Sequence, residues 1–212
     1  TSSFATKIPM CSSPPSTELA GSVSPGSVQP PKNNVTIIAD PATMLAPAEF
    51  KALHPLGTAP IITDGDLVLP ESGAIIDYII GKYGNGRLSV PPSSPEFANY
   101  VFWFHFANAS LMPNMMLPMA FQFAGASGDH VPALKSLMSR KDSAFALIEK
   151  RLGDAPYFAG KEFTAADIIM LFPLTTMRNF CAVDLTHFPN LRAYLKRIGE
   201  RPAYQRALAQ GN

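Results

Sequence analysis

Residues 53–83 read LHPLGTAPIITDGDLVLPESGAIIDYIIGKY. Residues 61–63 (IIT) and 67–69 (LVL) are short apolar runs typical of β-strands, and the Asp-Gly-Asp segment between them has the composition of a hairpin turn. Pro60 opens the first strand, where a proline removes no hydrogen bond from the ladder. The apolar residues that follow the second strand have the spacing of one buried helix face: Ala74, Ile75, Tyr78 and Ile79. The stretch therefore predicts a β-hairpin followed by a helix.

The junction between the hairpin and this helix, Glu71-Ser72, has the chemistry of a site for a zwitterion. The first N–H groups of a helix have no partner in a preceding turn, and the helix dipole is positive there, so a carboxylate is attracted. Ser72 adds a hydroxyl donor for the carboxylate, and Glu71 adds a negative charge for an ammonium group. The alternative is that Ser72 is only the N-cap of the helix, which is a common structural role for serine.

The wider pattern resembles the glutathione-binding half of the glutathione transferase family. The resemblance rests on these residues: Pro55-x-Gly57-x-x-Pro60, Asp64-Gly65, Glu71-Ser72-x-Ala74-Ile75 and Tyr78. It extends to the end of the chain, where residues 188–195 and 201–204 match the last helices of the family, and it covers residues 35–208 in all. The resemblance implies a thioredoxin-like N-terminal domain followed by an all-helical C-terminal domain.

The resemblance also implies where glutathione binds. In the family, the proline that matches Pro60 is cis, and its neighbour Ile61 offers backbone groups to the cysteinyl part of glutathione. The Glu71-Ser72 pair holds the γ-glutamyl zwitterion. Many members have a lysine at or near Thr58 that reaches the glycine carboxylate, whereas Thr58 donates only a neutral hydrogen bond, so a weaker contact is expected there.

Three regions are expected along the chain. Residues 1–34 are rich in serine and proline and are predicted to be irregular or disordered, because such a segment buries too little apolar surface to offset its ordering entropy. Residues 35–88 form the glutathione-binding domain, with a strand at 35–38. A Pro/Ser linker then leads to the helical domain, residues 94–212, whose first helix is predicted to begin at Pro95.

The first strand–helix unit of the family, which holds the Ser, Tyr or Cys that acts on the glutathione sulfur, is not visible in the sequence. Ser12 and Ser13 are weak candidates for the activating group, and Cys11 is another. A truncated or alternatively spliced chain, a wrong gene start and a real structural variant all explain this pattern equally well.

The helical domain contains a strongly apolar segment at residues 100–107, which is expected to be buried on more than one face. Pro113 and Pro118 are predicted to kink or end its helix. By resemblance, one side of this helix lines the pocket for the electrophilic substrate, with these candidates: Trp103, Phe106, Ser110 and Met115. Ordinary core packing is the alternative for each of the four.

Two further signals concern folding. Residues 133–152 have the spacing of one helix, and Gly153 is predicted to stop it. Thr164 and Asp167 form a capping-box pattern at the start of another helix, and we assign the pattern to stability and not to chemistry.

Composition excludes several classes of protein. The net charge is +1, so no global field favours nucleic acid. Two cysteines provide neither a disulfide framework nor a zinc site, and no metal is expected. No apolar run has the length of a membrane span, and residues 1–20 lack the apolar core of a secretory signal. A cytoplasmic protein is the expectation.

The predicted activity is attack of the glutathione thiolate on a small electrophile, in detoxification or in a biosynthetic pathway of secondary metabolism. Two alternatives remain open: a protein that binds glutathione without catalysis, and a glutathione-dependent isomerase or lyase on the same scaffold. A homodimer is implied by the resemblance alone.

Overall fold

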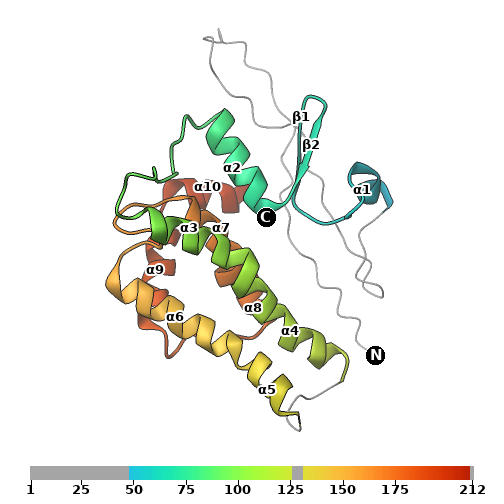
Figure 1. Cartoon of the computed structure of the whole chain (residues 1–212), viewed down its shortest axis with the longest axis vertical. Helices are drawn as coiled ribbons and strands as arrows, with labels where there is room; N and C mark the ends of the chain where they lie inside the picture. The colour runs from blue at the N-terminus through green and yellow to red at the C-terminus, as the bar shows by residue number, and fades with distance from the viewer. Residues whose placement is uncertain (1–47, 126–130, 211–212) are drawn as a thin grey trace. The chain divides into compact units, whose positions relative to one another are not determined.

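The computed structural model describes residues 48–125 and 131–210 (Figure 1). These residues form two compact units. The hairpin unit contains residues 48–78 and 199–210, and the helical unit is Ile79–Ile198. The predicted irregular segment at 1–34 and the predicted strand at 35–38 lie outside the described residues, and the predicted linker at 89–95 stays a prediction.

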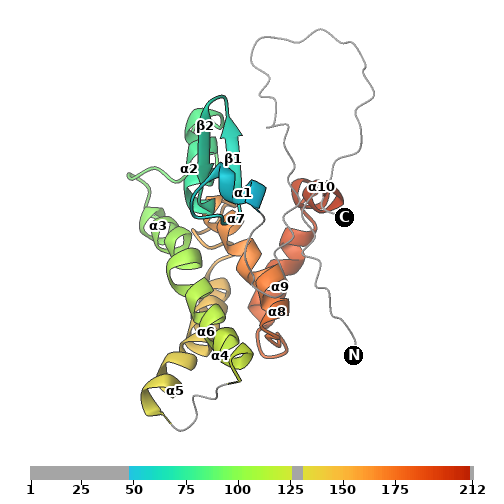
Figure 2. The same cartoon turned by 90° about the vertical axis from the view of Figure 1, so that its right-hand side faces the viewer.

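The hairpin unit begins with helix α1 (Ala48–Leu53), which is followed by strands β1 (Ile61–Asp64) and β2 (Leu67–Pro70). The strands pair in antiparallel fashion, from Ile61 opposite Pro70 to Asp64 opposite Leu67 (Figure 2). The predicted hairpin is confirmed, although Asp64 belongs to the strand and the turn is only Gly65-Asp66. Gly65 has φ +60°, the left-handed conformation that the first residue of a type II′ turn requires.

Helix α2 (Ser72–Lys82) follows directly, and its start belongs to the hairpin unit. The Tyr78 hydroxyl donates a hydrogen bond of 2.6 Å to Oδ2 of Asp64, which joins α2 to the end of β1. The predicted buried face of α2 is only partly confirmed: Ile75 is buried and Tyr78 is half-buried, whereas Ala74 and Ile79 are exposed. Helix α10 (Pro202–Gln210) also belongs to this unit.

The helical unit is built from helices and two π-helical turns. Its elements are α3 (Phe97–Phe106), η1 (Ala107–Leu111), α4 (Met112–Phe123), α5 (Pro132–Met138), α6 (Arg140–Asp154), α7 (Ala165–Phe172), η2 (Pro173–Met177), α8 (Arg178–Phe180) and α9 (Pro189–Gly199). Its core contains several side chains with almost no exposed surface: Phe145, Ile148, Phe158, Leu174, Leu191 and Tyr194. Helix α3 begins at Phe97, two residues after the predicted start, and Glu96 is its N-cap.

Pro113 and Pro118 were predicted to kink or end the first long helix, and they do not end it, because the helical run continues through η1 and α4 to Phe123 (Figure 1). A kink at either proline stays a prediction. In η1 the N–H of Met112 donates to the carbonyl of Ala107, five residues back. This wider turn comes directly before Pro113, which then lies in the first turn of α4, where the missing N–H has little effect.

The single helix predicted for residues 133–152 is two helices, with a break at Ser139 between α5 and α6. Helix α6 also continues past Gly153 to Asp154. A Cβ atom at Gly153 would lie 2.9 Å from Nδ2 of Asn190, at the start of α9. Gly153 therefore allows α6 and α9 to pack closely, and it does not stop the helix.

The predicted capping box is confirmed, with Thr164 as the N-cap of α7. Asp167 accepts hydrogen bonds from the N–H and the hydroxyl of Thr164 at 2.8 and 3.2 Å. It also accepts bonds from the Phe158 N–H at 3.0 Å and from the Tyr194 hydroxyl at 3.3 Å. Burial raises the pKa of Asp167, although these four hydrogen bonds favour the charged form.

Candidate functional site

The candidate site lies where the hairpin meets the first turn of α2. Ile61 pairs with Pro70, so Pro60 and Glu71 each follow directly on the same end of the two-stranded ladder. The Ala59–Pro60 peptide bond is cis, as the family resemblance implied. The hairpin thus brings together the start of β1 and the start of α2, two segments that each contain predicted glutathione contacts.

Glu71 occupies the N-cap of α2. Its carbonyl accepts the N–H of Ile75 at 2.9 Å, which is the first hydrogen bond of the helix, and Ser72 is the first helical residue. By this backbone pattern Glu71 is the N-cap, and the choice between a structural and a binding role for the Ser72 hydroxyl stays open. Ser72 is half-buried and Glu71 is exposed, so the carboxylate of Glu71 is accessible beside the positive end of the helix dipole.

The backbone of Glu71 is strained. Its φ is +73°, a conformation that glycine adopts easily and that a residue with a side chain adopts at a cost of about 1–3 kcal/mol. Residues held in such conformations occur preferentially at binding and catalytic sites, where the strain fixes a side chain in a useful direction. A glutamate in this conformation agrees with the predicted role of its carboxylate, and that role stays a prediction.

The loop before β1 is a tight turn over residues 54–57. The N–H of Gly57 donates to the carbonyl of His54 at 2.9 Å, and the N–H of Leu56 donates to Nδ1 of His54 at 3.3 Å. Gly57 has φ +60°, and the side chain of Lys51 from α1 packs against it. Thr58, a predicted glutathione contact, follows this turn and is exposed.

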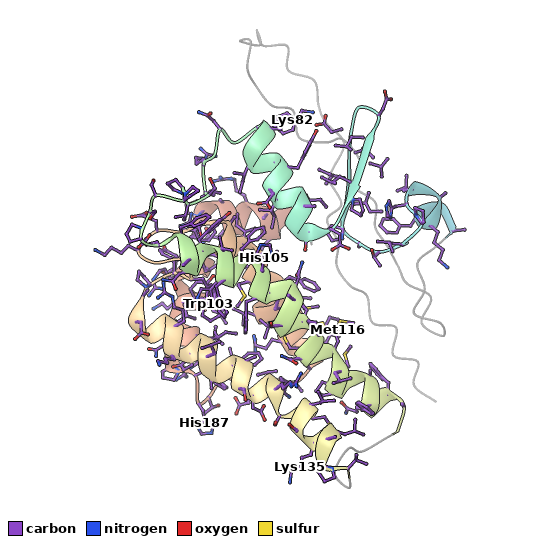
Figure 3. All side chains as sticks on the ribbon, viewed as in Figure 1. Lys82, Trp103, His105, Met116, Lys135 and His187 are labelled. Carbon is purple, nitrogen blue, oxygen red and sulfur yellow. The ribbon has the colours of Figure 1, made fainter. Side chains whose placement is uncertain are left out.

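The four predicted substrate-pocket residues lie on or near one helical run of the helical unit. Trp103, Phe106 and Met115 are buried, and Ser110 is half-buried in η1. The ring of Trp103 lies 4.9 Å from that of Phe158 and 5.0 Å from that of Phe106, in the interior of the unit (Figure 3). Such contacts are typical of core packing, and the assignment of these residues to a substrate pocket stays a prediction.

Ser12, Ser13 and Cys11, the predicted candidates for activating the thiol, lie outside the described residues. Within residues 48–125 and 131–210, no three metal-binding side chains gather closely enough to hold a metal ion. In the same part of the chain, no helix combines the length and the apolar character needed to cross a membrane.

Sequence reasoning missed the packing of Lys51 on Gly57 and the hydrogen bond between Tyr78 and Asp64. Tyr78 was used only as a motif residue with apolar spacing, although a hydroxyl on a buried helix face indicates a need for a hydrogen-bond partner.

Comparison with known proteins gives consistent matches. The family model described as "Glutathione S-transferase, N-terminal domain" matches residues 36–87, and the one described as "Glutathione S-transferase, C-terminal domain" matches residues 111–202. The chain is 31% identical to Glutathione S-transferase 3 of Schizosaccharomyces pombe, over 74% of this chain and 69% of that protein. It is 30% identical to Glutathione S-transferase 3 of Zea mays, over 76% of this chain and 75% of that protein.

A solved structure matches as well. The glutathione S-transferase from Actinobacillus pleuropneumoniae has a TM-score of 0.71 and 32% sequence identity, over 82% of this chain and 78% of that chain. The likeness therefore includes both the hairpin unit and the helical unit.

Proposed function

Because this chain belongs to the glutathione transferase family, we propose that it conjugates glutathione to small electrophilic molecules. Its fold is the expected one, a thioredoxin-like N-terminal domain with only a small sheet in its described part and a mostly helical C-terminal domain. The observation on which the proposal depends is the strained Glu71 beside Ser72 at the start of α2, next to the end of the ladder that Pro60 also borders.

The γ-glutamyl end of glutathione has a carboxylate and an ammonium group, and the start of α2 offers a partner for each. The carboxylate accepts from the Ser72 hydroxyl and from N–H groups of the first helical turn, at the positive end of the dipole. The ammonium pairs with the carboxylate of Glu71. The backbone of Ile61, after the cis Pro60, binds the cysteinyl residue, and Thr58 donates a neutral hydrogen bond nearby.

The reaction requires the thiolate form of glutathione. A thiol with a pKa near 8.5 is mostly protonated at neutral pH, and lowering the pKa by about two units needs roughly 2.7 kcal/mol of preferential stabilisation of the anion. The thiol proton passes to solvent, and the sulfur then forms a bond to an electrophilic carbon. With an aryl halide, that carbon releases halide together with its bonding electron pair.

The remaining assignments belong to the same proposal. The electrophile binds against the helical domain near Trp103, Phe106, Ser110 and Met115, and the half-buried Ser110 is the most accessible of the four. The boundary between the two domains lies in residues 89–95. The protein is a cytoplasmic homodimer that uses glutathione as its co-substrate and needs no metal.

Two assays with the full chain test this function. Conjugation of glutathione to 1-chloro-2,4-dinitrobenzene is followed by absorbance, and binding is measured on glutathione resin. Turnover together with binding supports a transferase. Retention on the resin without turnover of this or other electrophiles favours a protein that binds glutathione without catalysis, or an isomerase or lyase. Absence of both binding and turnover contradicts the proposal.

Tyr78→Phe is expected to weaken glutathione binding about threefold, the effect of losing one hydrogen bond worth about 0.5–1.5 kcal/mol. The bond from Tyr78 joins the middle of α2 to the end of β1, so its loss loosens the helix on the hairpin and lets Glu71 and Ser72 move relative to Pro60. Isothermal titration calorimetry measures the dissociation constant, and urea unfolding measures stability.

Asp64→Asn is the matched control for Tyr78→Phe, because its side-chain carbonyl still accepts the tyrosine hydroxyl, and its binding is expected to stay closer to that of the parent. If Tyr78→Phe lowers the free energy of unfolding and leaves the dissociation constant unchanged, the bond stabilises the fold without positioning the site.

A further inference from the structure

The turn that precedes β1 depends on one residue, His54. Its carbonyl accepts the N–H of Gly57 at 2.9 Å, and its ring atom Nδ1 accepts the N–H of Leu56 at 3.3 Å. Pro55 has no backbone N–H. His54 therefore accepts both of the N–H groups that the next three residues possess, one with its backbone and one with its side chain.

This turn determines how the chain enters the candidate site. Gly57 ends the turn with φ +60°, and only Thr58 and Ala59 separate it from Pro60, whose peptide bond is cis. Thr58 and Pro60 are both predicted glutathione contacts. A change in the conformation of residues 54–57 would therefore move two of the groups that the tripeptide is expected to touch.

Acceptance of a hydrogen bond by Nδ1 requires the neutral form of the imidazole. In that form one ring nitrogen carries a proton and the other a lone pair, so Nδ1 accepts only when the proton is on Nε2. The imidazolium carries a proton on both nitrogens and accepts no hydrogen bond. Histidine has an ordinary pKa of about 6.5, so this change of form falls close to neutral pH. Acidification therefore removes the bond from the N–H of Leu56.

His54 is the only histidine in residues 48–78 and 199–210, the described part of the hairpin unit. Lys51 of α1 is a charged side chain that packs on the same turn, against Gly57. The other charged side chains of α1, the hairpin and α2 are these: Glu49, Asp64, Asp66, Glu71, Asp77 and Lys82. Carboxylates ordinarily titrate near pH 4 and lysines above about pH 10, so histidine is the residue type that changes charge in the range between them.

We propose that neutral His54 is a positioning residue for the glutathione site, an assignment that rests on the proposed function. It holds the turn that presents Thr58 and Pro60 to the tripeptide, and its protonation releases the N–H of Leu56 and loosens this turn. Glutathione binding therefore weakens as the pH falls through the titration of the histidine.

The protonated ring also adds a positive charge near an anionic ligand, which favours binding. His54 is only half-buried, so this attraction is weak and added salt screens it. The loss of the hydrogen bond is not screened in this way, because the imidazolium has no lone pair at any salt concentration. Measurements at high salt therefore isolate the effect of the turn.

Isothermal titration calorimetry of glutathione on the full chain tests the inference, at high salt and between about pH 7.5 and about pH 5.5. The parent is expected to bind about threefold more weakly at the lower pH, the effect of one hydrogen bond. His54→Asn is the matched control, because an asparagine side chain accepts a backbone N–H two residues on and does not titrate. This variant is expected to bind like the parent at the higher pH and equally well at the lower one. His54→Ala is expected to bind about threefold more weakly than the parent at the higher pH and to show no pH dependence.

The backbone amide of Leu56 gives a second measurement that needs no ligand. In amide NMR spectra of the free chain, its signal is expected to follow the histidine titration in the parent and to stay in place in His54→Asn. A signal that does not move in the parent would contradict the hydrogen bond to the ring.

The outcomes for the inference and for the proposed function are distinct. If His54→Asn keeps the pH dependence of the parent, or if acidification leaves binding to the parent unchanged or tighter, the inference is wrong and the proposed function stands. If the parent binds no glutathione at any pH, the proposed function fails, and the positioning role of His54 fails with it.

Discussion

Glutathione binding is expected to weaken at least tenfold in both Glu71→Gln and Glu71→Gly, whereas only Glu71→Gly is expected to become more stable than the parent. Both changes remove the carboxylate that pairs with the ligand ammonium, and a charge-assisted bond is worth about 1.5–3 kcal/mol. Glycine also relieves the backbone strain at φ +73°, which should raise the free energy of unfolding by roughly 0.5–1 kcal/mol. Titration calorimetry and urea unfolding measure the two quantities.

Glu71→Gln is the matched control in this pair, because glutamine keeps the size of the side chain and the strained backbone while it removes the charge. If Glu71→Gly lost binding and Glu71→Gln bound glutathione like the parent, the loss would be due to the changed backbone and not to the missing carboxylate. Unchanged binding in both variants would contradict the proposed role of Glu71.

Ser72→Ala, combined with Glu71→Gln, extends the same prediction. Ser72 is the first residue of α2 and not its N-cap, so removal of its hydroxyl leaves the first backbone hydrogen bond, from Ile75 to Glu71, intact. The double variant is expected to fold and to lose retention on glutathione resin. Retention equal to that of the parent would rule out this end of α2 as the γ-glutamyl site.

Asp167→Ala is expected to be the most destabilising single substitution considered for this protein, by about 3–5 kcal/mol. It removes a carboxylate that accepts four hydrogen bonds. The buried N–H groups of Thr164 and Phe158 then lose this acceptor. A buried donor without a partner costs about 1–3 kcal/mol. For a chain of this size, each kcal/mol lowers the melting temperature by about 2–4 °C, so differential scanning calorimetry detects the change readily.

Thr164→Ala is a milder companion variant, because Asp167 keeps its bonds from the backbone of Thr164 and from Phe158. Loss of the cap is expected to cost on the order of 1 kcal/mol. Equal stability of Asp167→Ala and the parent would show that the capping box does not stabilise α7.

Asp167 should also give stability a dependence on pH. Burial raises the pKa of Asp167 in the folded state above 3.8, the value taken for the unfolded state. Between the unfolded and the folded pKa, the folded state therefore holds the proton more strongly than the unfolded state. The contribution of this carboxyl to stability is therefore full below pH 3.8 and is lost as the pH rises through the folded pKa.

Asp167→Asn cannot titrate at this position, so it isolates that contribution. The stability of the parent minus that of Asp167→Asn is expected to grow as the pH is lowered from 7 toward 4, as measured by urea unfolding at each pH. A difference that shrinks on acidification would mean that the hydrogen bonds to Asp167 outweigh its burial and lower its pKa.

The sequence by itself determined those features that depend on residues close together in the chain. The two apolar runs around Gly65 predict the hairpin, and the Thr164–Asp167 spacing predicts the capping box, because turns and caps are made by side chains a few residues apart. The Glu71-Ser72 junction was recognised for the same reason, since both residues border one helix start. The family motif added the cis bond at Pro60.

Tertiary structure decided everything that depends on packing between distant segments. Asp167 meets Tyr194, 27 residues away, and Gly153 proved to be a packing position against Asn190 and not a helix stop. The placement of Lys51 over Gly57 depends on how the turn folds back onto α1. Local periodicity does not encode such contacts, because the free energy that selects them comes from burial and hydrogen bonding across the whole fold, where only the folded chain brings the partners together.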